Sequence, residues 1–304
     1  MSKQPIVTRR DTRIAVLLDT DIGSNVDDAI ALSYLLRQPR CELLGISTVS
    51  GEPHRRAAIA QAVCAQNARE DVPIHVGAEA PLYGDQRQPN CEHFSKIEQL
   101  ATRTFSLENT SVSFLIDTIR KRPDEVVLLT IGTLTNVANV FRTDPEIPGL
   151  LKEVVCMAGT YFDPSLTDKP EWNIWCDPEA ADTVFQSSVS TSLIGLDVTR
   201  KCLLPKDDCL SRFAQVGTSM DLVTEMAKVW FAGRESIAFN DPLAAATIFE
   251  PGLCNMQPIG ARVSLAQDSF RGDVDVTRED ESPRKAAIDV DVQAFFNHYF
   301  EIVH

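Results

Sequence analysis

The sequence predicts an α/β protein with an open, mostly parallel, doubly wound sheet. Short, branched apolar runs alternate with amphipathic segments through most of the 304 residues, which is typical of a parallel sheet covered by helices on both faces. Polar residues recur where the apolar runs end, and that edge of such a sheet is where ligands bind. No internal repeat or low-complexity linker divides the chain, so we predict one domain over residues 1–304.

Each expected element follows from a local pattern. The first strand is the apolar run 14–18, which holds no Gly or Pro. A helix follows from Ala29, because apolar residues keep helical spacing until Pro39. Further strands are expected at 41–49, 72–76, 125–131, 153–157, 192–198, 261–265 and 286–290. Further helices are expected at about 55–66, 112–120, from 137, from 178, within 217–249 and up to 300, with a loop over 80–96.

The overall composition excludes several classes of protein. A hydrophobic content of 44% and a charged content of 24% are those of an ordinary globular protein. The net charge of −14 argues against a nucleic-acid partner. No apolar stretch is long enough to span a membrane, and residues 1–5 begin no signal-peptide core. We therefore expect a cytoplasmic protein without a membrane partner, whose eight scattered cysteines are reduced.

The loop after the first strand carries four carboxylates, and it is the most informative segment of the chain. Asp19 and Asp21 end the strand, and Asp27 and Asp28 begin the helix. So much clustered charge favours a bound cation, and an oxygen-only ligand set favours Ca²⁺ or Mg²⁺ over zinc. The plainer alternative makes Asn25 an N-cap and lets the two later acids complement the helix dipole. That alternative leaves the two acids at the strand end unexplained.

Five further motifs follow this loop in order along the chain. They are Thr48-Val49-Ser50-Gly51, Gly132-Thr133-Leu134-Thr135-Asn136, Met157-Ala158-Gly159, Glu171-Trp172-Asn173 with Asp177-Pro178-Glu179-Ala180-Ala181, and Asn240-Asp241-Pro242-Leu243-Ala244. With the acidic loop, they make the chain resemble the inosine–uridine-preferring nucleoside hydrolase family from about Ile14 through Ala246. The resemblance implies a Rossmann-like sheet of the nucleoside hydrolase type.

The resemblance also implies an activity and a set of site residues. The activity is hydrolysis of the N-glycosidic bond of ribonucleosides to ribose and free base, as in nucleoside salvage, by a homodimer or homotetramer. Carried over by motif, Asp21 takes a proton from a water on Ca²⁺. The calcium ligands are Asp21, Asp28, the backbone carbonyl of Ile131 and Asp241. The ribose hydroxyls meet Asp27, Glu171 and Asn173, and Met157 packs near the sugar.

Three positions depart from the family pattern. Ser24-Asn25 lengthens the acidic loop, and Glu52 stands where an Asn often reaches the sugar, so we assign Glu52 to substrate binding. Asn240 stands in the catalytic position where a His often protonates a leaving purine. Asn cannot act as a general acid, and such a loss typically costs about 10²–10⁴-fold in rate. The residues considered as replacements near the leaving base are His93, Trp230 and Arg234.

Two of the family residues have a simple structural alternative. Asp177 and Asp241 each precede a proline, which is the pattern of a helix N-cap with Pro at the first helical position. Taken alone, both are caps. The resemblance moves Asp241 to the metal site, and Asp177 remains a cap.

Two alternative functions remain open on the sequence alone. With Asn240 and Glu52 in place of family residues, the chain could bind a nucleoside or sugar without cleaving it. A haloacid-dehalogenase-like phosphatase would instead use Asp19 as the nucleophile, Asp21 as the acid/base and Mg²⁺ as the cofactor. That motif requires Thr or Val where this chain has Gly23, and it has no place for the later motifs.

Overall fold

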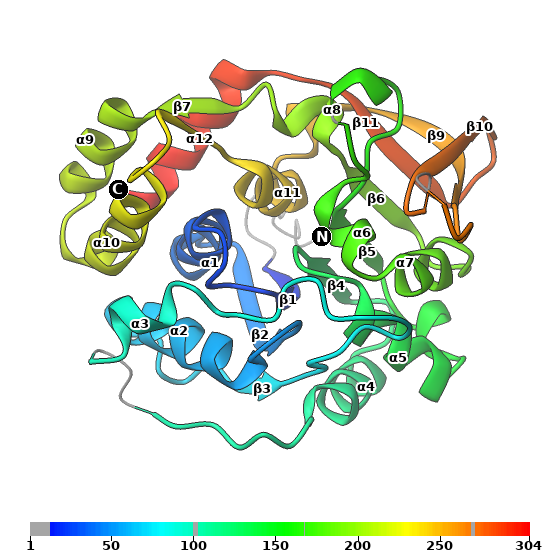
Figure 1. Ribbon diagram of the computed structural model, residues 1–304, viewed down its shortest axis with the longest axis horizontal. Helices are drawn as coiled ribbons and strands as arrows, with labels where there is room; N and C mark the ends of the chain where they lie inside the picture. Colours follow the sequence, from blue (N-terminus) through cyan, green and yellow to red (C-terminus); the bar gives the residue numbers. More distant parts are fainter. Residues whose placement is uncertain (1–12, 100–102, 167, 269–270) are drawn as a thin grey trace, which may run out of the picture.

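A nine-stranded sheet forms the centre of the protein (Figure 1). The computed structural model describes residues 13–99, 103–166, 168–268 and 271–304. The strand order is β10-β9-β11-β6-β5-β4-β1-β2-β3, and β7 and β8 form a separate two-stranded sheet. The strands are β1 (Ile14–Thr20), β2 (Cys41–Thr48), β3 (Ile74–Val76), β4 (Val126–Thr130), β5 (Glu153–Met157), β6 (Thr191–Ile194), β7 (Leu203–Pro205), β8 (Ser236–Ala238), β9 (Cys254–Val263), β10 (Val274–Arg278) and β11 (Arg284–Val290).

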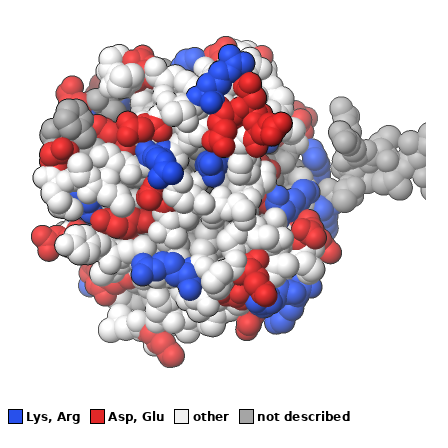
Figure 2. All heavy atoms as spheres, turned by 90° about the vertical axis from the view of Figure 1, so that its right-hand side faces the viewer, with Lys and Arg blue, Asp and Glu red and all other residues white. Residues whose placement is uncertain are grey.

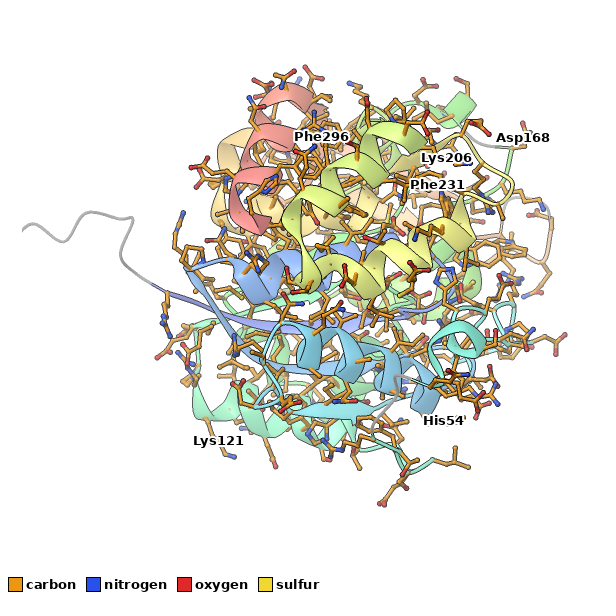
Figure 3. The ribbon with its side chains drawn as sticks, turned by 90° about the vertical axis from the view of Figure 1, so that its left-hand side faces the viewer. His54, Lys121, Asp168, Lys206, Phe231 and Phe296 are labelled. Carbon is orange, nitrogen blue, oxygen red and sulfur yellow. The ribbon has the colours of Figure 1, made fainter. Side chains whose placement is uncertain are left out.

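Helices cover both faces of the central sheet. They are α1 (Asp27–Arg37), α2 (Pro53–Gln66), α3 (Phe94–Ile97), α4 (Ser111–Lys121), α5 (Thr135–Thr143), α6 (Trp172–Cys176), α7 (Pro178–Phe185), α8 (Leu196–Thr199), α9 (Lys206–Val216), α10 (Asp221–Trp230), α11 (Asn240–Phe249) and α12 (Val292–Val303). Figure 3 shows α9, α10 and α12, marked by Lys206, Phe231 and Phe296, on the side opposite α4, marked by Lys121. The predicted doubly wound α/β architecture is confirmed.

Alternation along the strands divides the core into two clusters, one on each face of the sheet. In β1, Val16 and Leu18 pack in one cluster and Leu17 packs in the other, and all three are fully buried. A strand with both faces covered must be apolar at every position, which explains the unbroken run that marks β1 in the sequence. Burying each such side chain contributes about 1.5–3 kcal/mol.

The chain reverses its direction of travel across the sheet at β1. From β1 it moves outward through β2 to β3, and it then returns to place β4 on the other side of β1. All of these neighbouring pairs are parallel, so their carboxyl ends lie at one edge. The reversal opens a crevice there between β1 and β4. Asp21 follows β1 and Ile131 follows β4 at this crevice.

Several expected elements differ in the structure. The predicted strand 192–198 ends at Ile194, and residues 196–199 form the short helix α8. Within α8, Asp197 accepts backbone N–H groups of Tyr161 and Phe162, which fixes the neighbouring loop. Helix α9 and the edge strands β7, β8 and β10 were not predicted from the sequence, because they are short or mostly exposed and so carry weak periodicity.

Two expectations concern the environment of the protein. Of the helices that the structure describes, none has the length and apolar character needed to cross a bilayer. All eight cysteines are buried and form no disulfide. Residues 1–5, on which the expectation about a signal peptide rests, lie outside the described part.

Candidate active site

A cavity of about 580 Å³ opens at the carboxyl edge of the sheet. Its lining includes nine of the ten residues that the sequence assigns to the site: Asp21, Asp27, Asp28, Ile131, Met157, Glu171, Asn173, Asn240 and Asp241. They come from the ends of β1, β4 and β5 and from the first turns of α1, α6 and α11. Segments more than 200 residues apart in the sequence therefore form one site.

Three carboxylates meet at the base of this cavity. Asp27 and Asp28 lie in the first turn of α1, and Asp241 lies in the first turn of α11, which packs beside α1. One oxygen of each of the three lies within 4.8 Å of the others. Asp241 lies inside the first turn of α11, whose N-cap is Phe239, whereas Asp177 is itself the N-cap of α7 and accepts the N–H of Ala180. The structure thus separates the two residues that look alike in the sequence.

Burial and mutual repulsion disfavour the charged forms of these acids. Burial raises the pKa of Asp27 to about 6, although the hydrogen bond from Asn240 partly offsets this. The pKa values of Asp28 and Asp241 lie well above the usual range, first through burial and then through repulsion from neighbouring aspartates. Oδ1 of Asp27 is buried and has no hydrogen-bond partner among the described residues. A hard divalent cation fits this oxygen-only donor set.

Asp21 lies beside the cluster with one oxygen already engaged. Its Oδ2 accepts a 2.6 Å hydrogen bond from Nε2 of Gln88 in the loop after β3. The indole N–H of Trp172 donates to the other end of the same Gln88 amide. Gly132 packs closely here, because a Cβ at that position would lie 2.8 Å from the backbone N of Asp21. Gln88 therefore orients Asp21 within the cavity.

A buried arginine, Arg56, donates hydrogen bonds to the backbone of the acidic loop. Arg56 in α2 is fully buried, and its Nε donates to the carbonyl of Gly51 at 2.8 Å. Its Nη1 donates to the carbonyls of Asp21 and Ile22, and its Nη2 donates to the carbonyl of Asn90. One guanidinium thus joins the three loops that follow β1, β2 and β3.

The residues expected at the sugar form a fixed network of their own. Glu171 caps α6, and its carboxylate accepts the backbone N–H groups of Asn173, Ile174 and Gly159. Burial raises the pKa of Glu171. Nδ2 of Asn173 donates to the carbonyls of Ile131 and Met157 at 3.0 and 2.9 Å. These bonds hold the polar wall of the cavity rigidly in place.

Asn240 faces the acid cluster. Its Nδ2 donates to Oδ2 of Asp27 at 2.8 Å. Of the three residues considered near a leaving base, Trp230 and Arg234 line the cavity, and the Arg234 guanidinium lies 3.8 Å from the Trp230 ring centroid. His93 is buried away from the lining, and burial lowers its pKa to about 4.

Residues 16–297 match the family model described as inosine-uridine preferring nucleoside hydrolase. The chain belongs to this family. Uridine nucleosidase 1 of Arabidopsis thaliana is 28% identical over 252 residues, which cover 78% of this chain and 74% of that protein. The inosine-uridine preferring nucleoside hydrolase of Crithidia fasciculata is 29% identical over 267 residues, which cover 82% of this chain and 83% of that protein.

Solved structures of the family share this fold. A plant nucleoside hydrolase superposes with a TM-score of 0.84 at 20% identity, covering 95% of this chain and 98% of that chain. A purine-preferring ribonucleoside hydrolase from Gardnerella vaginalis superposes with a TM-score of 0.80 at 26% identity, with the same coverage. As a family member, the chain is a hydrolase that acts on the N-glycosidic bond of ribonucleosides.

In this nucleoside hydrolase, Glu52 and Asp19 both lie outside the cavity lining. Glu52 is absent from the cavity lining, and its carboxylate binds the N–H of Cys91 at 2.8 Å and Arg55 at 2.6 Å. Its left-handed backbone, with φ of 56°, places it at the start of α2. Asp19 is fully buried, and its Oδ1 is bound by Ser47 and Asn136. The nucleophile required by the phosphatase reading is therefore inaccessible.

Several residues around the site were not predicted from the sequence. Gln88 carried no signal, because it lies in a long loop without periodicity. Arg56 did carry one, since it shares a helical face with Ile59 and Val63, both of which are buried. Three further lining cations were not predicted from the sequence, and they are Arg87, Lys169 and Arg200.

Proposed function

We propose that this nucleoside hydrolase is calcium-dependent and that Asp21 is its general base. The observation that carries the proposal is the buried group formed by Asp27, Asp28 and Asp241, which shares one cavity with Asp21. Buried like charges at this spacing are costly unless a cation neutralises them. The Oδ1 of Asp27 adds an acceptor that no described residue of the chain fills.

The residues proposed to hold the cation are Asp21, Asp28, Asp241 and the carbonyl of Ile131. A calcium ion accepts about six to eight oxygen ligands, so one held by these residues would have positions left for the diol of a ribose and would lower the pKa of a bound water molecule. Magnesium accepts only about six ligands in a stricter geometry. Asp27 lies within 4.8 Å of both proposed metal ligands Asp28 and Asp241, so it connects the proposed metal site with the proposed sugar site.

Asp21 is proposed to take the proton of the attacking water. Gln88 holds its Oδ2, and Oδ1 accepts no hydrogen bond from the described residues. A carboxylate whose orientation is fixed before substrate arrives is suited to act both as a cation ligand and as a proton acceptor. The transition state of glycoside cleavage has oxocarbenium character, so the surrounding carboxylates stabilise its positive charge.

The sugar is proposed to bind against Asp27, Glu171, Asn173 and Met157. Because these polar groups are held by the protein before substrate arrives, a missing ribose hydroxyl leaves one of them unpaired. A site of this kind rejects deoxyribonucleosides strongly. The bond from Asn240 to Asp27 gives Asn240 an orienting role on the sugar side rather than a role as a proton donor.

The test is release of ribose from inosine, guanosine, adenosine, uridine and cytidine, measured as reducing sugar with and without a calcium chelator. Bound calcium is counted separately by atomic emission. We expect Asp21→Asn to lose hydrolysis even at calcium concentrations that fill the site, and Asp207→Asn in the exposed first turn of α9 to match the wild type. Full hydrolysis by Asp21→Asn would refute its role as the base.

A protein that retains calcium but releases no ribose would be a nucleoside-binding homologue instead. Light scattering after size exclusion tests the expected homodimer or homotetramer in the same preparation.

A further inference from the structure

The cavity has opposite charges at its base and at its rim. The aspartates at its base are at most 6% exposed. At the rim, Lys169, Arg200 and Arg234 are exposed, and Arg87 is half-buried. Glu92 is the exposed acid among the lining residues. For a chain with a net charge of −14, this grouping of cations around one opening stands apart from the overall balance.

Aromatic rings hold three of these cations. The Arg87 guanidinium lies 4.3 Å and the Lys169 ammonium 5.8 Å from the ring centroid of Trp175. The Arg234 guanidinium lies 3.8 Å from that of Trp230. A cation–π contact fixes the position of a charged group without neutralising it. The guanidinium charges of Arg87 and Arg234 are therefore held in place by the rings without being neutralised by them.

The rim arginines also lack carboxylate partners. Arg87, Arg200 and Arg234 form no ion pair within the described part of the chain, and Arg200 donates to the carbonyl of Leu166 instead. Elsewhere, arginines such as Arg120 pair with acids at 2.6–2.8 Å. On the face shown in Figure 2, basic side chains lie beside acidic ones. The three rim arginines thus differ from those surface side chains, because no described carboxylate pairs with them.

The cations approach the opening from opposite sides. Lys169 precedes α6, and Arg234 follows α10. Figure 1 shows these two helices on either side of α1 and α11, whose first turns carry the acids. A substrate whose ribose lies on the acids extends its base or its 5′ substituent toward the rim. An acidic base of the cavity and a basic rim together select a molecule that carries negative charge only at its outer end.

We propose that the substrate is a ribonucleoside with an anionic group, a carboxylate, an ionised ring or a phosphate, on the part that faces the rim. The inference rests on the proposed hydrolase function and names its substrate class. Each partly exposed charge pair is expected to favour the anionic member of a matched substrate pair by roughly 1.5- to 5-fold.

The experiment compares kcat/KM within matched pairs. Uridine and orotidine differ by one carboxylate on the base, guanosine and xanthosine differ by an ionisable ring, and uridine and uridine 5′-monophosphate differ at the 5′ end. We expect the anionic member of at least one pair to be favoured. Which pair responds tells whether the anion belongs to the base or to the 5′ position. The preference is also expected to fall as salt is raised.

Variants separate the rim from a general charge effect. The double variant Arg87→Gln/Arg234→Gln is expected to bring the substrate ratio close to one. The control is Arg212→Gln, whose guanidinium lies 4.7 Å from the Phe300 ring centroid but outside the cavity lining. It is expected to leave the ratio unchanged. A double variant that keeps the wild-type ratio would overturn the inference.

The outcome distinguishes this inference from the proposed function. If neutral nucleosides are hydrolysed as well as their anionic partners in all three pairs, the inference is wrong and the hydrolase function stands. If no ribonucleoside is hydrolysed, the proposed function fails, and titration calorimetry of the same pairs then decides the inference. Tighter binding of an anionic member supports it, and equal binding refutes it.

Discussion

Replacing Arg56 with methionine is expected to destabilise the protein by about 3–5 kcal/mol. The guanidinium is fully buried and donates to four backbone carbonyls and one hydroxyl, those of Gly51, Asp21, Ile22, Asn90 and Ser24. Three of these carbonyls belong to buried residues, and each costs ~1–3 kcal/mol when left unpaired. Removing the buried charge itself relieves part of that cost, which sets the expected range.

Urea denaturation followed by circular dichroism measures this change. Arg56→Lys, which keeps the charge but not the planar fork, is expected to fall between the methionine variant and the wild type. The matched control is Arg55→Met at the adjacent position, whose side chain is 44% exposed and pairs with Glu52. That variant is expected to lose less than about 1 kcal/mol. If Arg56→Met loses no more than this control, the guanidinium does not hold the three loops together.

Three further outcomes follow from the buried groups. Asp241→Asn is expected to lose bound calcium and at least ~10²-fold in kcat/KM. In chelator, its melting temperature is expected to exceed that of the wild type, because a buried charge has been removed. An unchanged amount of bound calcium would contradict this. Chelation is expected to lower the stability of the wild type more at pH 8 than at pH 5. The pKa of Asp27 is raised to about 6, so below that value protonation removes its buried charge. Equal losses of stability at the two pH values would contradict this prediction. The pKa of His93 is lowered to about 4, so its neutral form is favoured in the folded protein. Its contribution to stability, measured against His93→Gln, is expected to be complete above pH 6.5 and to fall as the pH drops toward 4. A difference in urea midpoint that does not change with pH would exclude this.

Local sequence patterns were enough to place the acids of the site. The apolar run before Asp19 marks a strand buried on both faces, and helical spacing after Asp28 marks the helix that follows. Parallel strands bring their carboxyl ends to one edge, so the acids, Ile131 and Met157 were expected to converge, and all except Asp19 line one cavity. The local pattern alone did not assign Asp241 to the site, because the residues around it also fit a helix cap.

Orientation was beyond the reach of local patterns. Glu52 has the sequence position of a sugar ligand, but its left-handed backbone turns the carboxylate toward Cys91. The short helix α8 replaced the end of a predicted strand for a similar reason, since Asp197 captures the N–H groups of a loop more than thirty residues away. Such choices depend on groups that are distant in the chain.

The sequence by itself determined the parallel sheet, the edge at which the acids meet and the order of the motifs, because each follows from periodicity and from residues that are close in the chain. Only the tertiary structure decided what surrounds the acids. Gln88 reaches Asp21 from an irregular loop, Arg56 joins three loops from beneath, and cations from four separate segments ring the opening. These contacts join segments that no local pattern relates, so their geometry is set only when the layers pack together.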